Sequence, residues 1–310
     1  MEGNIISPKL QGLTPVDTVY ETAKPSQNIY ANSIHLVGFE FDGTACFRKG
    51  TVKGPNAIRF DAPNIETYSP YMDSDLEDFD NLYDLGNLDL GESSDEEKQW
   101  KLGSEHFSNL IAADLLSENN SALFTLGGEH SISYAPIVKY LEAYPDLVLI
   151  HLDAHADLRD GYEGYHFSHA SIIRRTLDHF GPNHQLIQYG IRSGTKEEYA
   201  WMREHKTNCQ SFDDFIERVI AIDPNRPIYL TLDLDYFDPS FLPGTGTPEP
   251  GGETFHSFIK MNKILRNKRF VGCDVVELSP DIDASGNSAV FATKVVRELI
   301  LTLNLSMNKN

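Results

Sequence analysis

Apolar runs of strand length recur along the chain, and a polar or amphipathic segment follows each of them. Most of these runs are continuous rather than alternating in hydrophobicity, which is typical of strands buried on both faces of a parallel sheet. They occupy residues 34–39, 121–126, 147–152, 185–190, 228–234 and 271–276.

The segments between the runs have the length and the apolar spacing that favour helices. We predict helices over residues 132–144, 170–180, 196–205, 212–220, 255–265 and 290–303. Repeated strand-then-helix order is typical of a doubly wound parallel sheet with helices on both faces. Because this alternation has no clear break, we predict one domain over residues 1–310, with residues 1–30 as an N-terminal extension.

The stretch 60–97 departs from this pattern because it is strongly acidic. It contains thirteen Asp and Glu residues and no Lys or Arg. A calcium loop is one alternative, but the fixed ligand spacing of an EF-hand is absent. We therefore predict a solvated acidic excursion with an edge strand near residues 83–90, where the charge would discourage pairing with another sheet.

The whole chain is acidic, with 26 Lys and Arg against 46 Asp and Glu and a formal net charge of −20. Such a chain repels phosphate backbones, so we expect no nucleic-acid partner, and a small cationic substrate is weakly favoured.

No apolar run approaches the roughly 20 residues that span a bilayer, and the first residues lack the pattern of a secretory signal. The three scattered cysteines fit neither a disulfide framework nor a CxxC metal site. These features predict a cytoplasmic protein with no membrane partner.

The segment 151–157, with the sequence HLDAHAD, directly follows the apolar run LVLI. Side chains of an extended chain alternate between its two sides, so Asp153, His155 and Asp157 would project to one side. Ligands of open α/β sheets bind just beyond the carboxyl ends of the strands. Asp and His are ligands suited to Mn, Fe, Co, Ni or Zn. The segment is therefore a candidate metal site, with a hydrated acidic strand end as the alternative.

A second apolar run ends with Asp233 and Asp235, again two residues apart. Taken alone this pattern is less specific, because carboxylates are common at strand ends. If the sheet brings both strand ends together, four carboxylates meet, and like charges at close range must take up protons or be neutralised. Two divalent cations would balance the four negative charges, and binuclear sites of this kind suit hydrolysis.

Two further polar residues follow predicted strands. His130 lies in TLGGEHSIS, where Gly127 and Gly128 allow a tight turn between a strand and a helix. The glycine motifs that bind phosphate are absent from this turn. A lone histidine here would be structural, but beside the two acidic segments His130 is a candidate ligand. Glu277 follows the run VGCDVV and is a candidate functional carboxylate. The alternative is a charge at the end of a strand that forms a salt bridge.

Several segments together resemble the signature elements of the ureohydrolase family, which includes arginase, agmatinase, guanidinobutyrase and formiminoglutamase. They are GGEHSIS, HLDAHADLRD, TLDLDYFDPSFLPGTGTPEPGG, DVVELSPDID and, nearer the N-terminus, GFEFDGTACFRKGTVKGPNAIR. The resemblance implies a three-layer α/β/α sandwich around a mainly parallel sheet, as in arginase. It also implies hydrolysis of a guanidino group with two Mn²⁺ ions per chain, in a homotrimer or homohexamer.

Carried over by position, the resemblance implies two overlapping sets of metal ligands that share two aspartates. One ion would be held by His130, Asp153, Asp157 and Asp233. The other would be held by His155, Asp153, Asp233 and Asp235. The shared residues, Asp153 and Asp233, would then bridge the two ions.

Other residues acquire roles from the same resemblance. Glu277 would pair with the substrate guanidinium, since a planar guanidinium and a carboxylate form bidentate pairs. His169, in FSHAS, would lie over the substrate as a proton shuttle, and its neighbour His166 competes for that role. The departing amine would take up a proton through Asp157 or His169. Glu129 receives no metal role.

Two loops suggest which substrate is cleaved. Residues 158–169 lack the asparagine- and serine-rich loop expected of arginase, and residues 189–199 are more similar to agmatinase. We therefore expect cleavage of agmatine to putrescine and urea. Guanidinobutyrase or another guanidino-acid hydrolase, arginase and formiminoglutamase remain alternatives. Tyr162, Tyr165 and Phe167 are interpreted as packing residues.

Two hypotheses predict a different activity. A metal-binding scaffold that has lost catalysis would release no urea. A mononuclear zinc deacetylase of related fold would hold about one metal ion per chain rather than two.

Overall fold

A nine-stranded, mainly parallel sheet forms the centre of the computed structural model, which describes residues 3–309. The strand order is β11–β10–β12–β13–β9–β5–β8–β2, and β3 also pairs with β8. Each of these pairs is parallel except that of β2 with β8. In sheet order the strands are β11 (Gln185–Tyr189), β10 (Val148–Leu152), β12 (Pro227–Asp233), β13 (Arg269–Val276), β9 (Ala122–Gly127), β5 (Ile34–Phe39), β8 (Leu82–Leu88) and β2 (Leu13–Thr14), with β3 at Lys24–Pro25.

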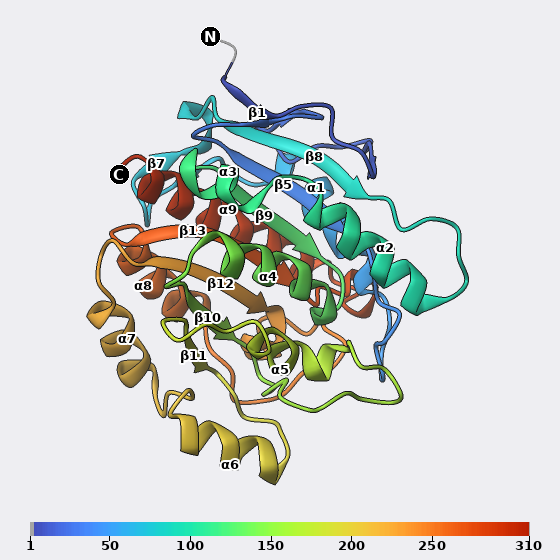
Figure 1. Ribbon diagram of the computed structural model, residues 1–310, viewed down its shortest axis with the longest axis vertical. Helices are drawn as coiled ribbons and strands as arrows, with labels where there is room; N and C mark the ends of the chain where they lie inside the picture. Colours follow the sequence, from blue (N-terminus) through green and yellow to red (C-terminus); the bar gives the residue numbers. More distant parts are fainter. Residues whose placement is uncertain (1–2, 310) are drawn as a thin grey trace.

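Helices cover both faces of the sheet, which gives three layers (Figure 1). One face carries α1 (Gly54–Asp61), α7 (Phe212–Ala221), α8 (Phe255–Leu265) and α9 (Asn287–Met307). The other carries α2 (Glu96–Ser108), α3 (Ala113–Glu118), α4 (Tyr134–Ala143), α5 (Ile172–Leu177) and α6 (Lys196–His205). The predicted three-layer α/β/α sandwich is confirmed. Among residues 3–309, no helix combines the length and the apolar character needed to cross a bilayer.

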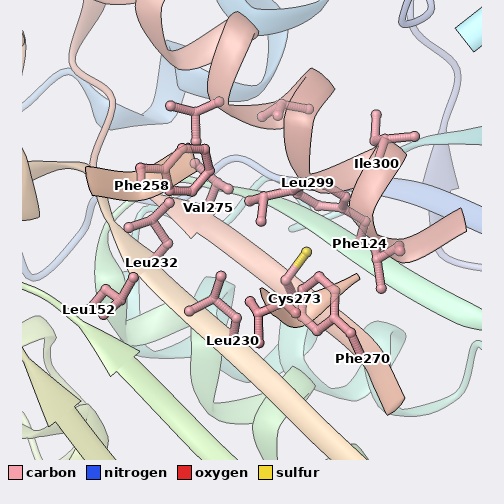
Figure 2. Close-up of a cluster of buried hydrophobic side chains, with 14 of the residues drawn as sticks. Phe124, Leu152, Leu230, Leu232, Phe258, Phe270, Cys273, Val275, Leu299 and Ile300 are labelled. Carbon is pink, nitrogen blue, oxygen red and sulfur yellow. The ribbon is translucent and has the colours of Figure 1, made fainter. Parts of the chain in front are cut away.

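Side chains of the central strands alternate between two hydrophobic cores, one on each face of the sheet. In β10, Ile150 and Leu152 point into the first core, whereas Leu149 points into the second. This alternation explains why the strands are apolar throughout, because each residue faces helices on one side or the other. Figure 2 shows the first core, which includes Phe124, Leu152, Leu230, Leu232, Phe258, Phe270, Cys273, Val275, Leu299 and Ile300.

The acidic stretch 60–97 is built into the sheet more closely than its charge predicts. It contains the hairpin β6 (Tyr68–Ser69) and β7 (Ser74–Asp75), and then β8, in which every residue is buried. The strand predicted near residues 83–90 is therefore present, but it is not at an edge, because β5 pairs with it on one side and β2 and β3 on the other. Asp84 in this strand accepts hydrogen bonds of 2.8 and 2.9 Å from the buried guanidinium of Arg59.

The N-terminal segment lies against the sheet. β1 (Ile5–Ser7) pairs with β4 (Ile29–Tyr30), while β2 and β3 extend the sheet beyond β8. In Figure 1 these strands form the dark blue layer beside β8. The segment therefore covers the edge that the parallel strands would otherwise expose, which limits pairing with other chains.

A buried histidine in β5 makes the stability of the fold sensitive to acid. Burial lowers the pKa of His35 to about 3, and its Nε2 accepts a 3.0 Å hydrogen bond from the backbone N–H of Tyr30. Because the unfolded chain binds the proton more tightly, this stabilisation is complete above the unfolded pKa and is lost as the pH falls below it. Between about pH 7.5 and pH 5 the loss should be about 2 kcal/mol of unfolding free energy.

Urea unfolding of the metal-free protein and of His35→Gln at the two pH values tests this expectation. Glutamine keeps an acceptor near the position of Nε2 but does not titrate, so the variant should lose less stability on acidification. Other titrating groups are common to both proteins and cancel in the comparison. Equal losses in the two proteins would contradict the prediction.

Candidate metal centre

The carboxyl ends of four neighbouring strands bring the predicted polar residues together. His130 begins a short 3₁₀ turn (His130–Ser133) after β9, and Asp153 and His155 follow β10. Asp233 is the last residue of β12, and Glu277 follows β13. Since β10, β12, β13 and β9 are successive neighbours in the sheet, their ends form one cleft at its carboxyl edge, where open α/β sheets bind ligands.

A first cluster surrounds the imidazole of His130. Its Nδ1 lies 3.0 Å from Oδ2 of Asp153, 3.1 Å from Oδ2 of Asp157 and 3.4 Å from Oδ2 of Asp233. All four side chains are buried. Three carboxylates from two different strands therefore converge on one ring nitrogen.

A second cluster lies beside the first and shares Asp153 with it. Nδ1 of His155 is 2.9 Å from Oδ2 of Asp235 and 3.5 Å from Oδ1 of Asp153. The other oxygen of Asp235 accepts a 3.0 Å hydrogen bond from the backbone N–H of Ala154. The structure thus brings all six predicted ligand residues into two adjoining clusters. The residues whose ligand atoms lie close enough together to hold one ion are His130, His151, Asp153 and Asp157 in the first cluster and Asp153, His155 and Asp235 in the second.

Two carboxyl groups of these clusters, those of Asp157 and Asp233, have raised pKa values and resist ionisation in the absence of a cation. Burial and the neighbouring Asp153 raise the pKa of Asp157 to about 7. Burial, Asp235 and Asp153 raise the pKa of Asp233 well above its usual range. Burial is the largest cause of both shifts and repulsion from neighbouring carboxylates adds to it, and positive charge placed between the carboxylates would relieve that repulsion.

Hydrogen-bond geometry on the far side of His130 shows which ring nitrogen is free. Nε2 lies 2.9 Å from the hydroxyl of Thr231, and that hydroxyl donates its proton to Asp274 at 2.7 Å. The hydroxyl has no second proton, so it must accept from Nε2–H, and in the neutral ring, which is the form that binds a metal ion, Nδ1 carries the lone pair. Within residues 3–309, Nδ1 has no hydrogen-bond partner although three carboxylate oxygens surround it. A lone pair amid negative oxygens fits a divalent cation well.

The turn that carries His130 is fixed by close packing of backbone. Gly128 donates a 2.8 Å hydrogen bond to the carbonyl of Phe39, and its own carbonyl accepts one of 2.8 Å from the N–H of Glu277. A Cβ atom at Gly128 would lie 1.9 Å from the carbonyl oxygen of Phe41. A glycine is therefore required here, and it ties the turn to the ends of β5 and β13.

Two functional candidates adopt left-handed backbone conformations. Asp157 has a φ of 53° and Glu277 a φ of 68°, a region that residues other than glycine rarely occupy. Glu277 Oε1 accepts a 2.8 Å hydrogen bond from the backbone N–H of His130. Strained conformations of this kind often occur at functional sites, where the surrounding structure enforces them.

A cavity of about 260 Å³ opens onto both clusters. Its walls include His130, His155, Asp157, Asp233 and Glu277, with Cys46, Arg159, Tyr162 and His169 among the other lining residues. Four of the six ligand candidates, together with Glu277, therefore border space that a small molecule can enter.

The two histidines proposed for the shuttle role lie in different surroundings. His169 lines the 260 Å³ cavity, and its Nδ1 is 3.4 Å from the hydroxyl of Thr44, which in turn donates to Glu129. The ring of His166 instead contacts the guanidinium of Arg175 at 2.8 Å and lines a separate cavity of about 220 Å³. The geometry therefore favours His169 over His166.

The aromatic residues of the same loop differ in their contacts. Tyr165 donates a 2.6 Å hydrogen bond from its hydroxyl to Glu96, and Phe167 stacks on Trp100 with ring centroids 4.4 Å apart. Both pack as interpreted from the sequence. Tyr162 lies at the cavity, with the guanidinium of Arg159 4.6 Å from its ring centre.

One residue of the site, His151, was not predicted from the sequence. His151 is the one histidine of β10, is fully buried, and places its Nε2 2.8 Å from Oδ2 of Asp153. It shares the two-residue spacing of Asp153, His155 and Asp157, so the spacing could have identified it. Its place inside an apolar strand concealed it.

Comparisons with known proteins agree with this geometry. Residues 32–302 match the sequence model of the arginase family. An agmatinase from Bacillus cereus is 38% identical over 275 residues, which cover 87% of this chain and 91% of that enzyme. The crystal structure of a Clostridium difficile protein, 38% identical, covers 90% of this chain and 98% of its own with a TM-score of 0.79. The agmatine ureohydrolase of Thermoplasma volcanium, 26% identical, covers 96% and 97% with a TM-score of 0.73.

Proposed function

Because the chain belongs to the arginase family, we propose that it is a ureohydrolase that uses two metal ions to cleave agmatine to putrescine and urea. The observation that carries this proposal is the convergence of two histidine–aspartate clusters on one cavity, with Asp153 common to both. Clusters that share a carboxylate suit two metal ions close together, which is the arrangement of binuclear hydrolases.

The proposed ligand sets follow the two clusters. His130, Asp153, Asp157 and Asp233 would hold one ion. His155, Asp153, Asp233 and Asp235 would hold the other. When bound, the two cations would supply Lewis acidity and a nucleophile that is active at neutral pH.

Glu277 would orient the substrate. Its Oε1 is held by the N–H of His130, so the carboxylate stays at the cavity wall beside the metal ligands and can pair with a planar guanidinium. This pairing would fix the guanidinium carbon for attack, which removes much of the entropic barrier. Asp157 and His169 both line the cavity, and either could deliver the proton that the departing amine requires.

Agmatine fits the charge of the cavity. Apart from the proposed metal ligands, Glu198 and Glu277 contribute carboxyl groups to its walls, so a substrate with two positive charges would meet acidic surroundings. The relatives named above as agmatinase and agmatine ureohydrolase support the same substrate.

One residue favours a second candidate function. Arg159 lines the cavity with a side chain that is 40% exposed. Its guanidinium could pair with the carboxylate of a guanidino acid. A guanidino-acid hydrolase, such as a guanidinobutyrase, is therefore the alternative that the substrate test must separate from agmatinase.

Urea release from the Mn²⁺-loaded protein tests the proposal. We expect kcat/KM for agmatine to exceed that for guanidinobutyrate, guanidinopropionate, arginine and free guanidine by at least about tenfold, and that for formiminoglutamate, followed by release of formamide instead of urea, by the same factor. A preference for guanidinobutyrate would select the alternative. No urea from any of these compounds, with two metal ions bound, would reject a ureohydrolase and leave the metal-binding scaffold.

Three further features belong to the proposal, of which the first two rest on the family resemblance and the third on the sequence features given above. They are Mn²⁺ as the native metal, a homotrimeric or homohexameric assembly, and a cytoplasmic location. The ligand set itself would also accept Ni, Co or Zn. Metal analysis of protein purified without added metal would identify the native ion.

A further inference from the structure

His151 lies beneath the proposed metal centre and has no role in the proposed function. We propose that it positions the shared carboxylate of Asp153 through a hydrogen bond from Nε2–H, and that it is not a metal ligand itself. The inference deepens the metal site of the proposed function and rests on it.

The orientation of the Gln188 side chain is fixed by its neighbours. One terminal atom lies 3.2 Å from the carbonyl oxygen of Ala156, and the other lies 2.8 Å from the hydroxyl of Thr207. A backbone carbonyl can only accept a hydrogen bond, so the atom that faces it must be the amide nitrogen. The amide oxygen then accepts from Thr207.

This orientation determines the tautomer of His151. The amide nitrogen of Gln188 is also 3.1 Å from Nδ1 of His151, and an NH₂ group can only donate. Nδ1 therefore accepts, and the proton of the neutral ring lies on Nε2. Nε2–H donates to Oδ2 of Asp153 at 2.8 Å.

Both oxygens of Asp153 are then held by one donor each. Oδ2 accepts from His151, and Oδ1 accepts a 2.6 Å hydrogen bond from the backbone N–H of His155. These two contacts fix the plane of the carboxylate. A carboxylate oxygen has two lone pairs, so each oxygen keeps one lone pair for a cation, on the side of His130 and of His155 respectively.

The same hydrogen bonds leave His151 without a free lone pair for a metal ion. Its Nδ1 lone pair is engaged by Gln188, and its Nε2 carries the proton that binds Asp153. His151, Asp153 and Gln188 are all fully buried. The ring lies within range of a cation at the first cluster, yet its hydrogen bonds direct it to the carboxylate.

Two substitutions separate a positioning role from other roles. In His151→Gln the amide nitrogen can reach the position of Nε2, whereas in His151→Asn the shorter amide reaches only the position of Nδ1. We expect His151→Asn to weaken Mn²⁺ binding about 10–100-fold, as for other residues that orient a ligand, and His151→Gln to stay within about threefold of the parent protein. Mn²⁺ titration followed by electron paramagnetic resonance gives both affinity and stoichiometry.

Each other outcome overturns the inference. If His151→Asn binds Mn²⁺ as tightly as the parent protein, His151 does not position Asp153. If Mn²⁺ affinity falls equally in both variants and one ion per chain is lost, His151 is a metal ligand. Melting of the metal-free proteins checks that both variants fold. If His151→Asn does not fold, ¹⁵N spectra of the Zn²⁺-loaded parent protein decide, because they must show His151 with its proton on Nε2. Since no readout needs urea release, failure of the proposed activity would be seen separately.

Discussion

Replacing Asp233 with asparagine should abolish urea release and leave fewer than two metal ions per chain. Asp233 is proposed to contact both ions, and its Oδ1 accepts a 2.8 Å hydrogen bond from the N–H of Asp235. Asparagine can keep that hydrogen bond through its carbonyl oxygen while it removes the negative charge. Mn²⁺ affinity should therefore fall by more than the roughly 10–100-fold that is typical of residues that only orient a ligand. Metal analysis after gel filtration and a urea assay measure the two effects.

The same substitution should not destabilise the metal-free protein. Asp233 is buried beside Asp153 and Asp235, so a neutral amide relieves repulsion, and the melting temperature without metal should stay level or rise. Asp281→Asn is a matched control, because Asp281 is exposed and contacts Lys53 at the surface. The control should keep activity, metal content and stability. Full activity with two ions in Asp233→Asn would refute the ligand assignment.

Replacing Glu277 with glutamine should lower kcat/KM for agmatine by roughly a hundredfold or more, because it removes charge-assisted hydrogen bonds to the guanidinium. The amide oxygen of glutamine can still accept from the N–H of His130, which is the contact that holds Oε1 now. The amide NH₂ then faces the cavity and opposes the N–H groups of the substrate. Both metal ions should remain bound.

Metal content distinguishes the possible reasons for a loss in this variant. A fall in kcat/KM with two ions still bound means that the substitution impairs recognition of the substrate and not metal binding. Loss of metal together with activity would mean that Glu277 acts through His130, and an unchanged kcat/KM would exclude a role in guanidinium recognition. Steady-state urea release and metal analysis on the same preparation provide the comparison.

The sequence predicts the sheet well because burial on both faces leaves a continuous apolar signal. Each of the six predicted strands is present to within two residues. The apolar runs do not show which strands are neighbours in the sheet. For example, β12 lies between β10 and β13, and each of these pairings joins segments that are far apart in the sequence. The convergence of His130, Asp153 and Asp233 depends on that order, so the sequence could indicate the ligands but not their distances.

The two-residue spacing of the candidate ligands identified the residues but not their arrangement. Asp153, His155 and Asp157 were expected on one side of an extended chain. The chain bends after β10 and Asp157 is left-handed, so Asp153 and Asp157 approach His130 while His155 approaches Asp235. Two adjoining clusters result where simple alternation predicts one row.

Helix α2 shows why a local charge run can conceal structure. The run of acids that ends at Glu97 led to the prediction of a solvated stretch. Asp95 instead caps the helix by accepting from the N–H of Lys98, and Trp100, Gly103 and Phe107 are buried at helical spacing. Acidic residues in a first helical turn are favourable because they face the positive end of the helix dipole, so the charge marked a helix start.

The left-handed backbone conformations of Asp157 and Glu277 lower the thermal stability of the fold, although their side chains are proposed to serve catalysis. Glycine adopts such angles without steric strain, and it would also withdraw negative charge from a crowded interior. Variants selected for thermal stability alone should therefore accumulate glycine at these two positions, with a higher melting temperature and a lower kcat. Directed evolution of a more thermostable enzyme must for this reason measure activity in every round.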